Sequence, residues 1–273
     1  MKNNFRFLFL FLILILSTIT CVIFIFYELY KQEKPNKNTE NIKVAVIDSG
    51  IDTKYLDVNV VKRFDHTKKE LDSFGHGTAV ANLINQNNHK VDYFDANILD
   101  ENGNTDVQTL IESLDWCIKN KVNLINMSFG LTENDTRLRN KINEVVKQHI
   151  IVVASSGNKI GFQSDYPARY NNVISISAVD SDHKLYKFAS KGKIDFVAPG
   201  VNVDTIQIKK LNKIKNLSGT SFATGYASGY ISKFISNDFS ITHRDLVNQL
   251  KKETKFIKNN KKDSTYGYGL LIK

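Results

Sequence analysis

Three short segments of the chain combine a reactive side chain with glycines or other small residues that allow close backbone approach. Asp48 lies in residues 46–52 (VIDSGID), His76 in residues 75–81 (GHGTAVA) and Ser221 in residues 218–224 (SGTSFAT). A serine hydroxyl is a poor nucleophile unless a base takes its proton, and that base needs an acid that orients it. The sequence supplies all three residue types, although each of them taken singly is also typical of a strand end or a helix cap.

The segments that would position these residues alternate between strand-like and helix-like patterns. Short β-branched runs bounded by turn residues occupy residues 43–48, 123–129, 150–156 and 173–179 and are typical of buried parallel strands. Residues 106–119 and 136–148 repeat apolar side chains at helical spacing, and Thr105 with Gln108 is predicted to cap the first of these helices. This alternation predicts an α/β fold with a doubly wound, mostly parallel sheet, helices on both faces, and ligands beyond the carboxyl ends of the strands.

The N-terminal residues differ in composition from the rest of the chain. From residue 7 to residue 27 there are about 21 uncharged, mostly apolar residues, which as a helix would span roughly 32 Å, the thickness of a bilayer's hydrocarbon core. Lys2 and Arg6 precede this run, no small-residue cleavage site follows it, and residues 31–41 are polar and charged. We therefore expect a transmembrane helix within residues 1–30, a linker over 31–41 and one folded domain over 42–273. A secretory signal that is removed after export is the alternative.

Composition and charge exclude several classes of protein. The chain is 42% hydrophobic and 24% charged and has two cysteines, which excludes collagen-like, disulfide-stapled and wholly disordered chains. Because residues 1–40 hold five basic and three acidic side chains, the remainder carries +7 of the net charge of +9. The basic residues form no dense run, so we expect a membrane surface or an acidic peptide as a partner and no nucleic acid.

The three reactive segments and two others resemble the motifs of the subtilisin-like serine peptidases. Residues 46–52, 75–81 and 219–224 are similar to the aspartate, histidine and serine motifs of that family, and they follow in the order found in subtilisin. Ser128, Phe129 and Gly130 resemble the strand along which substrate lies, and Ser155, Ser156 and Gly157 resemble the segment that ends in the oxyanion asparagine, here Asn158. The resemblance extends from about residue 42 to the C-terminus and implies the subtilisin-like fold.

The resemblance also implies a role for each matched residue. Ser221 would attack the peptide carbonyl, His76 would accept the proton and return it to the leaving amine, and Asp48 would orient the imidazole. The side-chain amide of Asn158 would donate to the developing oxyanion. Substrates of the family bind as an added extended strand, which implies endopeptidase activity on exposed peptide segments.

Asp165 precedes a Tyr-Pro pair that resembles the wall of the specificity pocket, at a position where the family often has glycine. A carboxylate on that wall would favour Arg or Lys at the residue before the cut, because a buried charge needs a partner. The alternative is a solvated loop aspartate that precedes a turn.

The chain also departs from the family pattern. Between the segment of His76 and the strand near residues 96–99 it is shorter than the common secreted enzymes, at the place of their calcium loop. Asp57 could match one calcium ligand, but its loop partners are missing, so we expect no metal ion and no other cofactor. Residues 31–41 are too short for a folded inhibitory propeptide, which in the family assists folding and delays activity. We therefore expect the chain to fold unaided, to be helped by another factor or to be controlled by its location.

Two classes of function follow from the sequence. In the first, the chain is a membrane-anchored serine endopeptidase that processes a peptide or protein precursor, and it resembles the leader peptidases that trim lantibiotic precursors. Its catalytic domain would lie outside the cytoplasm on a single-pass anchor, or would be secreted after signal cleavage. In the second, it is a catalytically inactive, membrane-tethered peptide-binding module.

Overall fold

The fold was analysed in a computed structural model of the 273-residue chain. It describes residues 15–26, 40–67, 72, 74–207, 213–255 and 263–272. The chain divides into two compact units, Met1–Asn38 and Thr39–Lys273. In the first unit, residues 15–26 form a helix with exposed side chains. The predicted transmembrane run also includes residues 7–14 and 27, which lie outside the described residues. No helix of the described part combines the length and the apolar character that crossing a bilayer requires.

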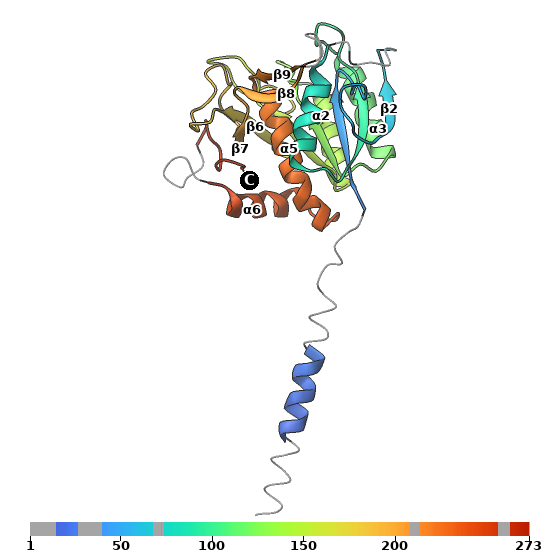
Figure 1. The fold of residues 1–273 in the computed structure, drawn as a ribbon, viewed down its shortest axis with the longest axis vertical. Coiled ribbons are helices and arrows are strands. Elements are labelled where there is room, and N and C mark those ends of the chain that lie inside the picture. The colour runs from blue at the N-terminus through green and yellow to red at the C-terminus, as the bar shows by residue number, and fades with distance from the viewer. Residues whose placement is uncertain are drawn as a thin grey trace, which may run out of the picture. The chain divides into compact units, whose positions relative to one another are not determined.

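The second unit is built on a seven-stranded sheet in the order β2-β3-β1-β4-β5-β6-β7, in which every pairing is parallel (Figure 1). The strands are β1 (Ile42–Asp48), β2 (Val60–Asp65), β3 (Val91–Asn97), β4 (Leu124–Met127), β5 (Ile151–Ser155), β6 (Ile174–Val179) and β7 (Phe196–Pro199). An antiparallel pair, β8 (Val203–Gln207) and β9 (Lys213–Leu217), lies outside this sheet. The predicted parallel sheet is thus confirmed, and the four predicted strands correspond to β1, β4, β5 and β6.

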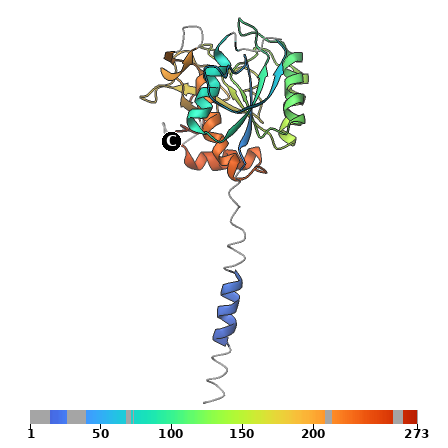
Figure 2. The ribbon, with the colours of Figure 1, turned by 45° about the vertical axis from the view of Figure 1, so that its right-hand side comes forward.

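Helices cover both faces of the sheet, as predicted (Figure 2). One face packs against α2 (His76–Asn87), α5 (Thr220–Asn237) and α6 (His243–Glu253), and the other against α3 (Val107–Lys119) and α4 (Thr136–Lys147). The predicted capping pair at α3 is wrong. Asp106 is the N-cap, and its side chain accepts a hydrogen bond from the backbone N–H of Thr109, because the helix begins one residue later than the capping-box pattern requires.

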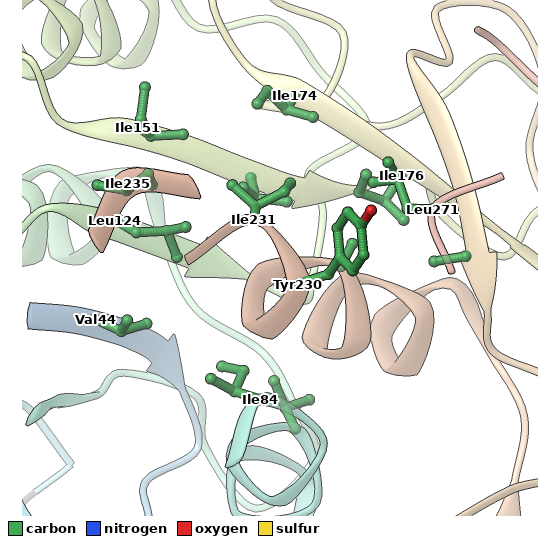
Figure 3. Packing of buried hydrophobic residues seen from close by; sticks show 14 of the residues in the cluster. Val44, Ile84, Leu124, Ile151, Ile174, Ile176, Tyr230, Ile231, Ile235 and Leu271 are labelled. Carbon is green, nitrogen blue, oxygen red and sulfur yellow. The ribbon is translucent and has the colours of Figure 1, made fainter. Parts of the chain in front are cut away.

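The core on the α5 side explains why this helix lies within the unit rather than on its surface. Ile231 and Ile235 of α5 pack among Val44, Leu124 and Ile151, which project from three neighbouring strands (Figure 3). All of these side chains are at most 1% exposed. Burying apolar side chains on this scale stabilises the fold by about 1.5–3 kcal/mol for each fully buried residue. The packing fixes the N-terminal end of α5 close to the carboxyl ends of the strands, where the site lies.

Candidate active site

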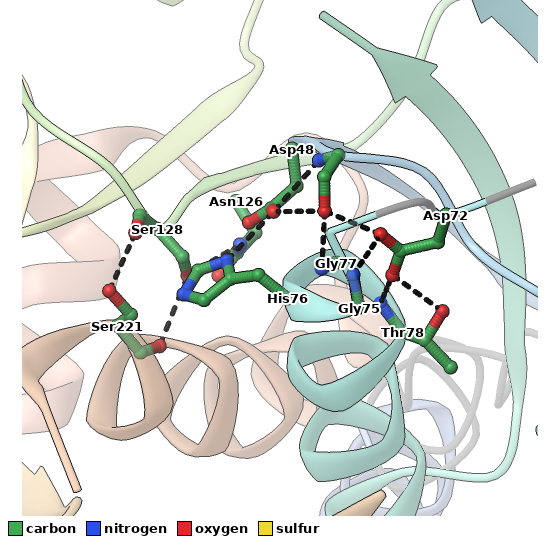
Figure 4. Close-up of polar contacts among 10 residues, drawn as sticks. Asp48, Asp72, Gly75, His76, Gly77, Thr78, Asn126, Ser128 and Ser221 are labelled. Carbon is green, nitrogen blue, oxygen red and sulfur yellow. Dashed lines mark hydrogen bonds and ion pairs between the residues drawn. The ribbon is translucent and has the colours of Figure 1, made fainter. Parts of the chain in front are cut away.

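Asp48 and His76 meet at the end of the central strand. Asp48 is the last residue of β1 and is fully buried, and its Oδ1 lies 2.7 Å from Nδ1 of His76, the first residue of α2 (Figure 4). Gly77 allows this approach, because a Cβ on that residue would lie 2.2 Å from the carbonyl oxygen of Gly50. A histidine held in this way presents its Nε2 away from the carboxylate.

Ser221 lies in the first turn of α5, on the far side of the imidazole from Asp48 (Figure 4). Its hydroxyl donates to the backbone carbonyl of Ser128 (2.6 Å), and the hydroxyl of Ser128 donates to the carbonyl of Ser221 (3.1 Å). Both side chains are described, and no hydrogen bond joins His76 to Ser221 in this structure. Catalytic hydrogen bonds often form only once substrate is bound.

The loop that precedes Ser221 is anchored to the sheet. The backbone N–H of Gly219 donates to the carbonyl of Gly200, the residue that follows β7 (2.8 Å). A Cβ on Gly200 would lie 2.7 Å from the Cβ of Ala223 in α5. The end of β7 and the start of α5 therefore lie in direct backbone contact, which fixes the position of Ser221.

The electrostatic surroundings of His76 favour its charged form. Burial lowers the pKa of His76, but the charge and hydrogen bond of Asp48 and the charge of Asp72 together outweigh burial, so the pKa lies above its ordinary value. The rings of Phe74 and Phe222 lie 5.8 and 5.6 Å from the imidazole, measured between centroids. The site can thus stabilise an imidazolium next to a hydroxyl, as proton transfer from Ser221 would require.

Asp72 is a second buried carboxylate at the site, and the sequence interpretation missed it. Its oxygens accept hydrogen bonds from the backbone N–H groups of Gly75 (2.6 Å) and Thr78 (2.8 Å) and from the hydroxyls of Ser49 (2.7 Å) and Thr78 (2.8 Å). Burial raises the pKa of Asp72, and the hydrogen bonds from Thr78 and Ser49 oppose that shift. Asp72 therefore ties the start of α2, and with it His76, to the residue that follows Asp48. Its position four residues before His76 does not show that its side chain reaches Ser49, so the sequence contained no sufficient signal.

Asn158 lies beside the first turn of α5 with its amide oriented by that helix. Oδ1 accepts from the backbone N–H of Thr220 (2.9 Å) and from its hydroxyl (3.0 Å). Because Oδ1 is held in this way, Nδ2 is the end of the amide that stays available to a ligand. This is the geometry that the oxyanion role predicted for Asn158 requires, with the donor beside the N-terminus of a helix.

The residues predicted to bind substrate lie at the ends of β4 and β5. Ser128, Phe129 and Gly130 follow β4; Ser155 is the last residue of β5, and Ser156 and Gly157 follow it. Asp165 lies between the two segments, since a Cβ on Gly130 would be 2.4 Å from its Cβ and a Cβ on Gly157 would be 2.5 Å from its Oδ2. The structure thus brings these predicted residues together around one carboxylate, and the two glycines leave room for it.

Asp165 is 6% exposed, which excludes the alternative of a solvated loop aspartate. Its Oδ1 lies 3.2 Å from Nζ of Lys159, which also donates to the hydroxyl of Thr132 (2.8 Å). Lys159 was not predicted to belong to the site, because its position directly after Asn158 gave no indication that its side chain reaches Asp165. The carboxylate on the predicted pocket wall therefore already has a cationic partner.

Within the described part of the chain, no group of three or more His, Cys, Asp or Glu side chains is arranged to hold a metal ion.

Comparison with known proteins relates the chain to one family of peptidases. The sequence profile of the subtilase family matches residues 39–269. Minor extracellular protease Epr of Bacillus subtilis is 32% identical over 85% of this chain and 38% of its own length. The thermostable alkaline protease of Halalkalibacterium halodurans is 30% identical over 84% of this chain and 65% of its own, and subtilisin E of Bacillus subtilis is 30% identical over 85% and 64%. The chain therefore spans less than two thirds of the length of these relatives.

Proposed function

Because the chain belongs to the subtilase family, we propose that it is a serine endopeptidase that hydrolyses peptide bonds with Asp48, His76 and Ser221. The observation that carries the proposal is the 2.7 Å contact between Asp48 and His76, with the imidazole lying between that carboxylate and Ser221.

The proposed reaction uses groups of the chain for every proton transfer and includes no metal or other cofactor. The Oγ of Ser221 attacks the carbonyl carbon while Nε2 of His76 takes the hydroxyl proton, and Asp48 stabilises the imidazolium. The carbonyl oxygen becomes an oxyanion that accepts from Nδ2 of Asn158 and from the backbone N–H of Ser221. His76 then gives its proton to the leaving amine, and a water molecule deacylates Ser221 by the same steps with His76 as base.

Labelling with a fluorophosphonate tests this proposal, because the reagent modifies a serine only when a neighbouring base activates it. We expect covalent modification at Ser221 in the wild-type chain and none in Ser221→Ala. Asn158→Asp serves as a second variant for comparison, because it keeps Asp48, His76 and Ser221. A folded wild-type chain with an unreactive Ser221 would reject the endopeptidase and favour a peptide-binding module without turnover.

For specificity, we propose that Asp165 selects Arg or Lys at the residue before the cut. Its burial, its position between Gly130 and Gly157, and its pairing with a lysine side chain support this assignment. The ammonium or guanidinium of a substrate would take over the role of Lys159, whose side chain is 44% exposed. Asp165→Gly tests the proposal: its preference for Arg and Lys over Leu and Phe should fall, and an unchanged preference would contradict the role of Asp165.

For location and substrate, we propose a single-pass membrane protein whose peptidase unit lies outside the cytoplasm and processes a peptide or protein precursor. The apolar run of residues 7–27 supports the anchor. The charge of +7 outside the first 40 residues supports an acidic precursor segment, such as the leader of a lantibiotic. Mass-spectrometric mapping of cut sites in peptide libraries with and without acidic segments tests this narrower proposal.

A further inference from the structure

A cavity of about 410 Å³ lies next to the segment that carries Asp165. Two arginines, two tyrosines and three asparagines line it, and Tyr166 directly follows Asp165 in the chain. Tyr166 is held by two backbone hydrogen bonds to Leu131, which follows Gly130. The cavity therefore has a fixed wall and a size within the range of ligand sites in proteins.

The two arginines are stacked on the two tyrosine rings. The guanidinium of Arg169 lies 4.7 Å from the ring centroid of Tyr166, and that of Arg139 lies 5.7 Å from the ring centroid of Tyr170. The two rings are 4.9 Å apart, and Tyr170 is fixed by its hydroxyl, which donates to Asn134 and to the carbonyl of Asp135. Stacking of this kind orients the guanidinium groups before any ligand arrives.

Neither arginine has a carboxylate partner among the described residues, and none of the side chains that line the cavity is acidic. The neighbouring basic residues of α4 differ in this respect. Arg137 is paired with Asp135, and Lys141 is paired with Asp115 and Glu144. Asp135, Asp115 and Glu144 are thus engaged with other cations, and among the described residues neither arginine of the cavity has a carboxylate partner.

We propose that this cavity binds carboxylate side chains of an acidic peptide segment, at a site separate from the residues that act on the scissile bond. Guanidinium groups match carboxylates in charge and in hydrogen-bond geometry. The asparagines favour a peptide over a free inorganic anion, because their amides both donate and accept and can pair with a peptide backbone. Among the asparagines that line the cavity, the amide of Asn172 donates to the side-chain oxygen of Asn143 (3.0 Å). The inference holds whether or not Ser221 is catalytic.

Fluorescence anisotropy of the full-length Ser221→Ala chain in a non-ionic detergent tests the proposal. The probe is a fluorescein-labelled peptide of four glutamates separated by glycines, and its control is the same peptide with glutamines. At low ionic strength we expect tighter binding of the glutamate peptide. Replacing both arginines (Arg139→Gln with Arg169→Gln) should weaken it about fivefold, a loss of about 1 kcal/mol that lies within the range for two exposed ion pairs.

Arg137→Gln is the charge-matched control for Arg139→Gln alone, because each removes one positive charge from α4 and only Arg139 lines the cavity. It should change the affinity much less than Arg139→Gln does. Arg139→Glu is a second variant in case the loss of Arg169, which donates to the carbonyl of Ser164, disturbs folding. Unchanged binding by folded arginine variants, or an equal loss in Arg137→Gln, would overturn the proposal. So would tighter binding of inorganic phosphate than of the glutamate peptide, measured by displacement of the probe at constant ionic strength, because the cavity would then be a phosphate site.

Discussion

At the scale of single residues, the orientation of the Asn158 amide allows a sharp test. Both hydrogen bonds from Thr220 go to Oδ1, so Asn158→Asp keeps an acceptor for the start of α5, removes the Nδ2 donor and adds a negative charge beside the oxyanion. We expect kcat to fall at least about 10²–10³-fold, the loss measured for the corresponding donor of subtilisin, with KM nearly unchanged. Steady-state kinetics on a peptide substrate gives both constants. If Asn158→Asp retained full kcat, the amide would only hold the helix and not the oxyanion.

Lys159 is a residue at which specificity can be changed without touching the triad. In the free protein its ammonium pairs with Asp165, so under the proposed specificity a basic side chain of a substrate has to replace it. Lys159→Met keeps the aliphatic part of the side chain and removes the competing charge. We expect its kcat/KM ratio for Arg over Leu before the cut to rise several-fold, as a partly exposed ion pair of about 0.2–1 kcal/mol allows. A fall in that ratio would mean that Lys159 assists binding of basic side chains.

Replacing Asp72 should shift the pH dependence of kcat/KM in one direction. His76 acts as a base only when neutral, so activity appears as pH rises through its pKa, and the charge of Asp72 helps to raise that pKa. Asp72→Asn should therefore move the acid limb of the profile of kcat/KM against pH to lower pH. Asp52→Asn removes another buried charge of the loop after β1 and should leave the limb in place. A shift of the acid limb to higher pH in Asp72→Asn would contradict this account.

At the scale of elements, the packing of α2 against α5 determines whether His76 and Ser221 meet. Gly229 is the point of closest approach, because a Cβ there would lie 2.5 Å from the carbonyl oxygen of Ile84 and 2.7 Å from the Cβ of Asn87. Gly225 is less restricted, with its nearest contact at 3.0 Å from the carbonyl oxygen of Val80. The two helices carry His76 and Ser221, the proposed base and nucleophile, in their first turns, so a small separation of the helices would also separate these two side chains.

Gly229→Ala is therefore expected to destabilise the fold by about 1–3 kcal/mol, the usual consequence of overpacking. Urea unfolding measures the change, and Gly225→Ala should cost less. The sign is the test, because in an open helix the same substitution stabilises by up to about 1 kcal/mol. A stabilised Gly229→Ala would show that the helices are not in close contact at this position.

The sequence was informative about elements wherever one local pattern decided the structure. The β-branched runs of β1, β4, β5 and β6 gave the parallel sheet, because such runs are buried on both faces and bounded by turn residues. β2 was not predicted, since its pattern is mostly exposed at the edge of the sheet, and the pairing of β8 with β9 depends on contacts that no local pattern contains. The start of α3 was misplaced by one residue because Thr105 and Asp106 are both good caps.

At the scale of the whole molecule, some parts of the site follow from local sequence patterns and others depend on tertiary contacts. The segments of Asp48, His76 and Ser221 could be located in the sequence because glycines and small residues surround them, and that of Asn158 because it resembles a motif of the subtilisin-like family. Lys159 and Asp72 could not be assigned, because their roles come from distances to Asp165 and Ser49 that only the folded chain sets. Residue type and order predict which groups are reactive, whereas the partners that adjust their charge depend on tertiary packing.

The division of the chain into Met1–Asn38 and Thr39–Lys273 gives a test of the proposed anchor. Both large core clusters lie in the second unit, so a chain that begins at Thr39 should fold and cleave a soluble peptide with the kcat/KM of the full chain. It should also leave the membrane fraction, because its excess of basic residues gives only a salt-sensitive attraction to anionic lipid. Carbonate extraction of membranes from cells that express either form measures the difference. If the full-length product were recovered in soluble form with residues 1–30 removed, the N-terminal segment would be a secretory signal. If the shortened chain resisted extraction at high salt, the membrane contact would lie within Thr39–Lys273.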